Sequence, residues 1–392
     1  MNKKIMDAIL NLEDNMINFR RKLHQFPELS MQEYETTKRI AKKLDKYKIS
    51  YRLTEPTGLI GEIEGNEPGP IILLRADIDA LPIHEENKIS YASKRDNVMH
   101  ACGHDSHAAM LLAAAKILSE NKDKFKGKIR LVFQPGEETG EGAKAMIEQG
   151  VLKDVDQVFG LHINSAWDIG TVYCPVGEMM AANDEVKIYF KGAEGHGARP
   201  NEGIDANMMA ASFLLNSQNV LTKELSALDS AVINFGKLKG GKAANIVSAE
   251  AILEGSVRTF STTVQTYIEE SLERYAKQTA NMYRGQYEMK YIKKVPSLIN
   301  NEKSTHLFYD IAGELFGEKN IDKKGKKTGS EDFAYYMSGD RGVLGVFAFI
   351  GARGEHVDTQ YNHHTNKFNI DESAMKYGVY FHIMYALNYL NK

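Results

Sequence analysis

The sequence predicts an α/β fold, in which a larger domain with a helix-covered central sheet is interrupted by a smaller ferredoxin-like α+β domain. Three observations predict it. The chain has 392 residues, whereas single cores stop growing at about 250 to 300 residues. Strand-like and helix-like segments alternate over residues 1–182. Residues 183–295 follow the order β-α-β-β-α-β.

The first part of the larger domain begins with helical patterns. Ser30 and Glu33 have the spacing of a capping box, and the apolar Ile40, Leu44 and Tyr47 behind them predict a helix. Further helices are expected at residues 105–120 and 140–149, and strands at 58–64, 70–76, 128–134 and 158–163. This alternation predicts a sheet covered by helices.

The insert is predicted from a change of pattern near residue 183. Strands are expected at 185–192, 231–238, 249–260 and 287–295, and helices at 205–221 and 262–283. In a ferredoxin-like unit the first and last strands lie side by side and antiparallel, so its two ends meet and it can be inserted into another domain. We therefore expect one discontinuous domain of residues 1–182 and 296–392, ending in a helix from Glu372, and an insert of residues 183–295.

The composition is that of a folded globular protein, with 43% hydrophobic and 26% charged residues. The net charge is -3, and no long block of one sign predicts a nucleic acid or membrane partner. Asp7, Glu13 and Asp14 interrupt the N-terminal apolar pattern, which argues against a signal peptide and makes a cytoplasmic location the expectation. The two cysteines, Cys102 and Cys174, are too few for a disulfide framework.

Metal-ligand side chains gather at the predicted strand ends and at one helix start. They are Asp77, Asp79, Cys102, His104, Glu137, Glu138 and His162. Each alone has an ordinary structural explanation, such as a turn, a helix cap or a solvated loop. Ligands bind at the carboxyl ends of the strands of open α/β sheets, however, and carboxylate, imidazole and thiolate together are the donors that divalent metals prefer. Together they predict a shared metal centre.

Several longer motifs occur in a recognisable order. They are Met99-His-Ala-Cys-Gly-His-Asp105, Gln134-Pro-Gly-Glu-Glu138, Gly195-His-Gly-Ala-Arg-Pro200, Ser256-Val-Arg-Thr-Phe260 and Gly329-Ser-Glu-Asp-Phe333. With them the chain resembles the aminoacylase, hippurate hydrolase and indole-acetyl-amino-acid hydrolase family, the amidohydrolase branch of the dinuclear metallopeptidases. The resemblance covers nearly the whole chain and implies a catalytic domain interrupted by a lid and dimerisation domain.

The resemblance also implies the metal ligands, which are Cys102, His104, Glu138, His162 and His364. His363 is the alternative for the last, and Asn366 stands where the family usually has Pro. Related peptidases carry a His-x-Asp ligand motif where this chain has Arg75-Ala-Asp77, so Asp77 is expected to support the site without binding metal. Two divalent ions are implied, Zn²⁺ or Mn²⁺ first, with Co²⁺ or Ni²⁺ as alternatives.

The remaining roles also follow from the resemblance. It makes Glu137 the general base and His196 the donor to the developing oxyanion, with Asn245 and Arg258 holding the substrate after closure of the lid. Without the resemblance, His196 would be interpreted as a histidine of a surface turn, and Arg258 as an exposed strand residue.

The expected reaction is hydrolysis of an N-acyl amino acid, with an N-acetyl, benzoyl or related group, to a carboxylate and a free amino acid. An N-acetyl-diaminopimelate deacetylase and a dipeptidase or aminopeptidase of the same superfamily are the alternatives. A non-catalytic metal-binding or ligand-binding homologue is the alternative from another class, and Glu137 discriminates it, since a structural site needs no spare base. An exposed strand edge or helix face of the insert would suit a homodimer.

Overall fold

The computed structural model describes residues 1–339 and 342–392, which form two compact units. Unit 1 comprises residues 1–177, 299–325 and 331–392, and unit 2 comprises 178–298 and 326–330. Unit 2 thus includes 326–330, a segment that the sequence analysis assigned to the larger domain. In the described part of the chain, no helix is long and apolar enough to cross a membrane.

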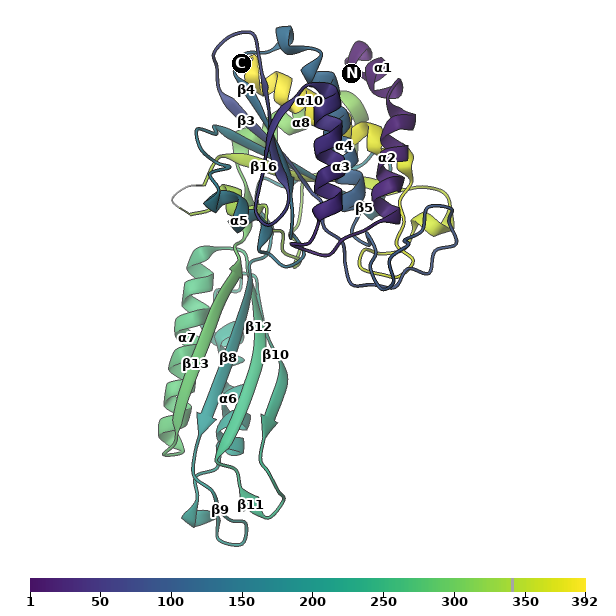
Figure 1. The fold of residues 1–392 in the computed structure, drawn as a ribbon. Coiled ribbons are helices and arrows are strands. Elements are labelled where there is room, and N and C mark those ends of the chain that lie inside the picture. Colours follow the sequence, from purple (N-terminus) through teal and green to yellow (C-terminus); the bar gives the residue numbers. More distant parts are fainter. Residues whose placement is uncertain (340–341) are drawn as a thin grey trace. The chain divides into compact units, whose positions relative to one another are not determined.

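Unit 1 is built on an eight-stranded mixed sheet of order β1-β2-β4-β3-β5-β16-β6-β15 (Figure 1). The strands are β1 (Ser50–Leu53), β2 (Leu59–Glu64), β3 (Ile71–Asp77), β4 (Lys128–Gln134), β5 (Gln157–Asp168), β6 (Val172–Tyr173), β15 (Ile321–Asp322) and β16 (Gly345–Arg353). The central strands β3, β4 and β5 run parallel and are almost wholly buried. Their continuous apolar runs suit a sheet covered on both faces.

The helices of unit 1 bury a single apolar core with this sheet. They are α1 (Lys3–Leu10), α2 (Glu13–Gln25), α3 (Tyr34–Tyr47), α4 (His104–Ser119), α5 (Gly142–Glu148), α8 (Glu302–Phe316), α9 (Ala334–Met337) and α10 (Met375–Leu390). Helix α4 is buried on nearly all sides because it packs against α2, α3 and α10 as well as against β3. A helix that is apolar all round is expected in such a central position.

Unit 2 has a four-stranded sheet of order β10-β12-β8-β13 and two long helices. The elements are β8 (Asn183–Lys191), β9 (Gly195–His196), α6 (Ala206–Asn216), β10 (Ala231–Gly240), β11 (Ile246–Val247), β12 (Glu250–Thr259), α7 (Thr262–Met282) and β13 (Gln286–Val295). The first and last strands, β8 and β13, pair antiparallel as the ferredoxin-like order requires. Short strands β7 (Gly177–Met180) and β14 (Leu298–Asn300) lie where the chain crosses between the units.

The structure confirms the predicted fold class and corrects some local predictions. The predicted capping box is wrong, because α3 begins at Tyr34 and the Glu28 carboxylate accepts hydrogen bonds from the Glu35 and Thr36 amides. Ser30 instead donates to Asp79. The helix predicted at 205–221 ends at Asn216, and the strand predicted at 158–163 continues to Asp168 as β5.

Candidate metal centre

The sheet register sets the donor side chains of unit 1 side by side. In the parallel pair of β3 and β4, Asp77 lies opposite Gln134, and in the pair of β3 and β5, Arg75 lies opposite Gly160. His162 is therefore level with Asp77, while Glu137 and Glu138 follow the end of β4. The carboxyl ends of these strands meet at one edge of the sheet, where open α/β proteins bind their ligands.

The donor atoms form several overlapping groups. Within each group the ligand atoms lie within 4.8 Å of one another. The groups relevant to the predicted ligands are Cys102 with His104 and His162, Cys102 with Glu138 and His364, and His104 with Glu137 and Glu138. The Cys102 Sγ lies 3.4 Å from the His162 Nε2 and 3.3 Å from the His364 Nε2. Unit 1 thus brings together the five predicted ligands and the predicted base, and Cys102 is common to two groups.

Hydrogen bonds determine which ring nitrogen of each histidine faces the cluster. The His104 Nδ1 donates to the Asp79 carboxylate at 3.0 Å, and the His162 Nδ1 donates to the Ile163 carbonyl at 2.5 Å. Because those oxygens only accept, each Nδ1 carries a proton, so Nε2 is the atom that offers a lone pair when the ring is neutral. Neutral imidazoles with a free Nε2 are the form that binds metal.

Two donor atoms of the cluster have no hydrogen-bond partner among the described residues, although they are buried. They are the His104 Nε2 and the Glu138 Oε1, which lie 4.0 Å apart, and the Glu138 Oε1 is also within ion-pair distance of the His364 Nε2. A buried polar atom without a partner costs free energy, so its presence needs an explanation. A divalent cation between these atoms would satisfy both, and the thiolate, imidazole and carboxylate donors fit such an ion.

Gly103 lets the Cys102 and His104 side chains converge. Its φ is +91°, and a Cβ atom at this position would come within 2.5 Å of the Ile163 side chain. Burial, then the Glu138 and Glu137 carboxylates, hold the pKa of the Cys102 thiol well above its usual range. A thiol in such surroundings is a poor nucleophile, whereas a bound cation would favour the thiolate. Both features suit Cys102 as a metal ligand.

The two neighbouring C-terminal histidines differ in their contacts. The His363 Nε2 accepts the Ser165 amide at 3.2 Å, so its lone pair is already used, and its Nδ1 lies 3.7 Å from the Cys102 Sγ. The His364 Nε2 lies 3.4 Å from the Glu138 carboxylate, and its backbone has a φ of +61°, which is uncommon for a residue other than glycine. The geometry favours His364 as the C-terminal donor.

Glu137 lies between the donor cluster and a buried ionic network. Its carboxylate accepts the Asp332 amide at 3.4 Å. Burial raises the pKa of Glu137 well above its ordinary value, and the neighbouring Glu331, Glu138 and Asp332 raise it further. Nearby, the buried Arg75 guanidinium pairs with Asp77, Glu331 and Asp332 at 2.6 to 2.9 Å. A raised pKa is what a general base working near neutral pH requires.

The other predicted residues belong to unit 2, where they do not form one cluster. His196 in β9 pairs with Ile246 in β11, and the Asn245 carbonyl accepts the Gly197 amide, so His196 and Asn245 are neighbours beyond one end of the sheet (Figure 1). Arg258 lies near the opposite end of β12, where its guanidinium donates to Ser330 at 3.2 Å. Both His196 and Asn245 are exposed, and Arg258 is half-buried.

Sequence reasoning gave no role to several residues around the cluster. Asp79 was noted only as a strand-end carboxylate, yet it accepts from His104, from Ser30 and from the Glu138 amide. His107 was given no role, although it follows His104 by three residues and the two side chains therefore lie on one face of the helix. That spacing was the available signal.

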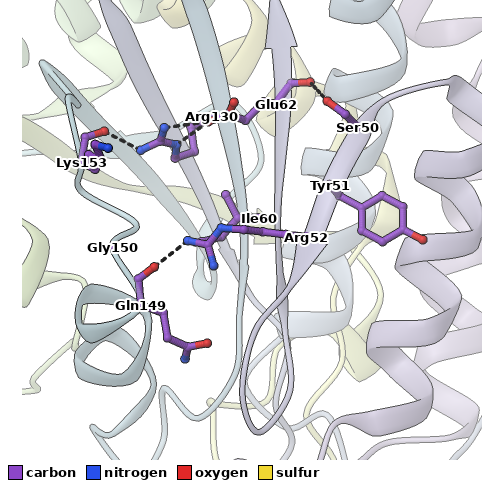
Figure 2. Close-up of a pocket in the computed structure, with 9 residues that line it drawn as sticks. All are labelled: Ser50, Tyr51, Arg52, Ile60, Glu62, Arg130, Gln149, Gly150 and Lys153. Atoms are coloured by element: carbon purple, nitrogen blue, oxygen red, sulfur yellow. Dashed lines mark hydrogen bonds and ion pairs between the residues drawn. The ribbon is translucent and has the colours of Figure 1, made fainter.

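Figure 2 shows a cavity of about 490 Å³ in unit 1 that none of these donors lines. It is lined by β1, β2, β4 and the segment after α5, and it contains none of the predicted site residues. Its Arg130 guanidinium is taken up by Glu62 and by the Val151 and Lys153 carbonyls, and its Arg52 donates to the Gln149 carbonyl. These hydrogen bonds connect the strands to the segment after α5 and have a structural role. The cavity is therefore not a better candidate for the functional site than the donor cluster.

Comparison with known proteins gives close relatives over the whole chain. N-acetyl-L-cysteine deacetylase of Bacillus subtilis strain 168 is 40% identical over 371 residues, which are 94% of this chain and 87% of the relative. Thermostable carboxypeptidase 2 of Saccharolobus solfataricus is 35% identical over 395 residues, which are 100% of this chain and 99% of the relative. The chain is therefore similar to enzymes named for amide and for peptide hydrolysis.

A solved structure and a family profile agree with these relatives. A Bacillus subtilis protein described as a dinuclear metal-binding peptidase from the M20 family has a TM-score of 0.85 and 33% identity, covering 97% of this chain and 99% of that one. The profile described as Peptidase family M20/M25/M40 matches residues 73–388. These findings confirm the predicted resemblance. The chain belongs to peptidase family M20/M25/M40 and is a metal-dependent hydrolase of its amidohydrolase branch.

Proposed function

We propose that the protein hydrolyses N-acyl amino acids to a carboxylate and a free amino acid. The observation that carries the proposal is the pair of buried donor atoms without hydrogen-bond partners, the His104 Nε2 and the Glu138 Oε1, with the Glu137 carboxylate in the same group of donors. The two relatives support the same class of substrate, because a deacetylase of an N-acetyl amino acid and a carboxypeptidase both release an amino acid with a free carboxylate.

The residues proposed to hold two divalent cations are Cys102, His104, Glu138, His162 and His364. When bound, such cations supply Lewis-acid chemistry and make water a nucleophile near neutral pH. A thiolate ligand favours Zn²⁺ over Mg²⁺ or Ca²⁺, and Mn²⁺, Co²⁺ or Ni²⁺ are the alternatives. The cytoplasmic location stays a prediction.

The proton transfer is proposed for Glu137. Its carboxylate takes a proton from the attacking water, whose oxygen bonds to the acyl carbon, and delivers that proton to the amide nitrogen as the carbon–nitrogen bond breaks. Water is thereby added across the amide, and Glu137 returns to its starting state. His196 is proposed to donate a hydrogen bond to the oxyanion, and Asn245 and Arg258 to hold the substrate.

The spacing inside unit 2 supports the expected homodimer. Arg258 lies eight residues beyond Glu250 along β12, which is about 27 Å at 3.3 to 3.4 Å per residue. His196 pairs with β11, before the first residue of β12. One chain therefore cannot bring both side chains to one small substrate, and we propose that a second copy supplies His196. Mixing His196→Ala with Cys102→Ala protein should restore turnover if it does.

The test is release of free amine from N-acetyl, N-benzoyl and N-acyl-diaminopimelate substrates and from unblocked dipeptides, with Zn²⁺, Mn²⁺ or Co²⁺ added. We expect turnover of the acylated substrates and a loss of about a hundredfold to ten-thousandfold in Glu137→Gln, with metal content unchanged. Preference for unblocked dipeptides would favour a peptidase. An inactive protein that binds metal would favour the non-catalytic alternative, and loss of metal in Glu137→Gln would make Glu137 a ligand.

A further inference from the structure

His107 has both of its ring nitrogens engaged. It lies in the first turn of α4, is 1% exposed, and its Nδ1 is 2.5 Å from the Asp77 carboxylate. The Ile163 amide donates to its Nε2 at 3.0 Å. A backbone N–H needs an acceptor, so the Nε2 keeps its lone pair. The Nδ1 therefore carries the proton and donates a hydrogen bond to the Asp77 carboxylate.

This engagement decides between two roles for His107. Its nitrogen lies with donors of Asp77 and His104 in a group that is compact enough to hold a cation. A histidine ligand, however, must offer a free lone pair, and the lone pair of His107 is directed at the Ile163 amide. Asp77 is likewise occupied, since its second oxygen accepts from the buried Arg75 at 2.6 Å. The contacts therefore argue against a third cation at this group.

The backbone of Ile163 connects His107 with the predicted ligand His162. Its amide is held by His107, and its carbonyl accepts from the His162 Nδ1 at 2.5 Å. That amide belongs to the planar peptide unit that joins His162 to Ile163, so anchoring it fixes the backbone that carries the His162 ring. Whereas His104 is oriented directly by the Asp79 carboxylate, His162 depends on a backbone segment that needs such an anchor.

We infer that His107 is a positioning residue, which together with Asp77 holds the Ile163 backbone and thereby fixes the orientation and tautomer of His162. The inference rests on the proposed metal centre and deepens it. Hydrogen-bonding partners of metal ligands typically contribute tenfold to a hundredfold to metal affinity. His107 would contribute to metal affinity indirectly, through the backbone of Ile163.

Two substitutions of His107 separate its two hydrogen bonds. In His107→Gln the amide oxygen can take the place of the Nε2 and accept from Ile163. In His107→Asn the shorter amide reaches only the place of the Nδ1, so it can donate to Asp77 but leaves the Ile163 amide without an acceptor. We expect the Asn variant to bind Zn²⁺ or Co²⁺ tenfold to a hundredfold more weakly in competition with a chelator, and the Gln variant to recover most of the affinity.

The number and environment of bound ions give a second readout. Both variants should still load two ions per chain at saturating metal, because no ligand has been removed. The visible absorption of bound Co²⁺ should change in His107→Asn and return toward the wild-type spectrum in His107→Gln. His382→Phe is the matched control, since His382 is as buried as His107 and its Nδ1 has no partner among the described residues. It should leave affinity and spectrum unchanged.

Three results would overturn the inference. They are wild-type affinity in His107→Asn, an equal loss in the His382→Phe control, and the loss of one ion at saturating metal, which would make His107 a ligand. Should His107→Asn fail to fold, the nitrogen-15 spectrum of the metal-loaded wild type shows which ring nitrogen of His107 carries the proton. The His107 signals are assigned by their absence from the spectrum of His107→Gln. A His107 proton on Nε2 contradicts the inference, and one on Nδ1 supports it. Turnover is not used, so a metal-binding protein without hydrolase activity would reject the proposed function alone.

Discussion

The two units carry their candidate functional side chains in opposite ways. In unit 1, His104 and His162 are buried, and a hydrogen bond on each Nδ1 directs the Nε2 to the cluster. In unit 2, His196 and Asn245 are exposed. The ring contact of His196 among the described residues is a hydrogen bond from the nearby Ala198 amide. The candidate donors of unit 1 are therefore oriented by the fold itself, whereas the roles proposed for His196 and Asn245 require contact with a substrate.

The largest effect is expected where unit 1 is most organised, at Cys102. Cys102→Ala removes the donor that two of the groups share, so metal content should fall from two ions to at most one per chain, and turnover should fall to background. Elemental analysis and the amine-release assay measure both. Cys174→Ala is the control, because Cys174 is also buried in unit 1 but lies outside every donor group of the described residues. Full metal content in Cys102→Ala would remove Cys102 from the centre.

His196 tests the corresponding claim for unit 2. His196→Ala should lower kcat by about a hundredfold to a thousandfold, the usual effect of losing one oxyanion donor, without lowering metal content. His306→Ala, which removes another exposed histidine, should change neither quantity. A kcat equal to that of the wild type would show that the exposed His196 is a surface residue after all.

The same contrast explains what the sequence could and could not predict. The donors Cys102, Glu138 and His162 lie beside regular strands and a helix start, so alternating patterns locate them. Asp79 and His107 act through hydrogen bonds to residues far along the chain, such as Ile163, and no local pattern encodes those partners. The choice of Glu28 over Ser30 at the start of α3 likewise depends on Asp79 binding Ser30.

In unit 2 the local patterns predicted the elements but not their distances. The order β-α-β-β-α-β predicted the pairing of β8 with β13 correctly. It could not show that His196 and Arg258 lie near opposite ends of the sheet, because the β9 and β11 strands that hold His196 have only two residues each. Strands of that length carry no period that a sequence pattern can reveal.

Metal removal should affect the two units unequally. A ligand that binds only the native state stabilises it by about 2.7 kcal/mol at a free concentration one hundred times its Kd, which is roughly a hundredfold in the opening equilibrium. Chelation should therefore speed amide hydrogen exchange in α4, which carries His104, and leave α7 of unit 2 unchanged. Equal acceleration in both helices would mean that metal stabilises the whole chain rather than unit 1.

The smallest effect is expected at Arg258, which should act on binding alone. Arg258→Lys keeps the charge but loses the paired donors that suit a carboxylate, and losing one charge-assisted hydrogen bond, worth about 1.5 kcal/mol, should raise KM about tenfold with little change in kcat. Arg274→Lys, at an exposed arginine paired with Glu224, is the control. Substrates whose amino-acid carboxylate is replaced by an amide should be turned over equally by both variants and the wild type. If Arg258→Lys instead raised KM for those substrates as well, Arg258 would bind another part of the substrate or only support unit 2.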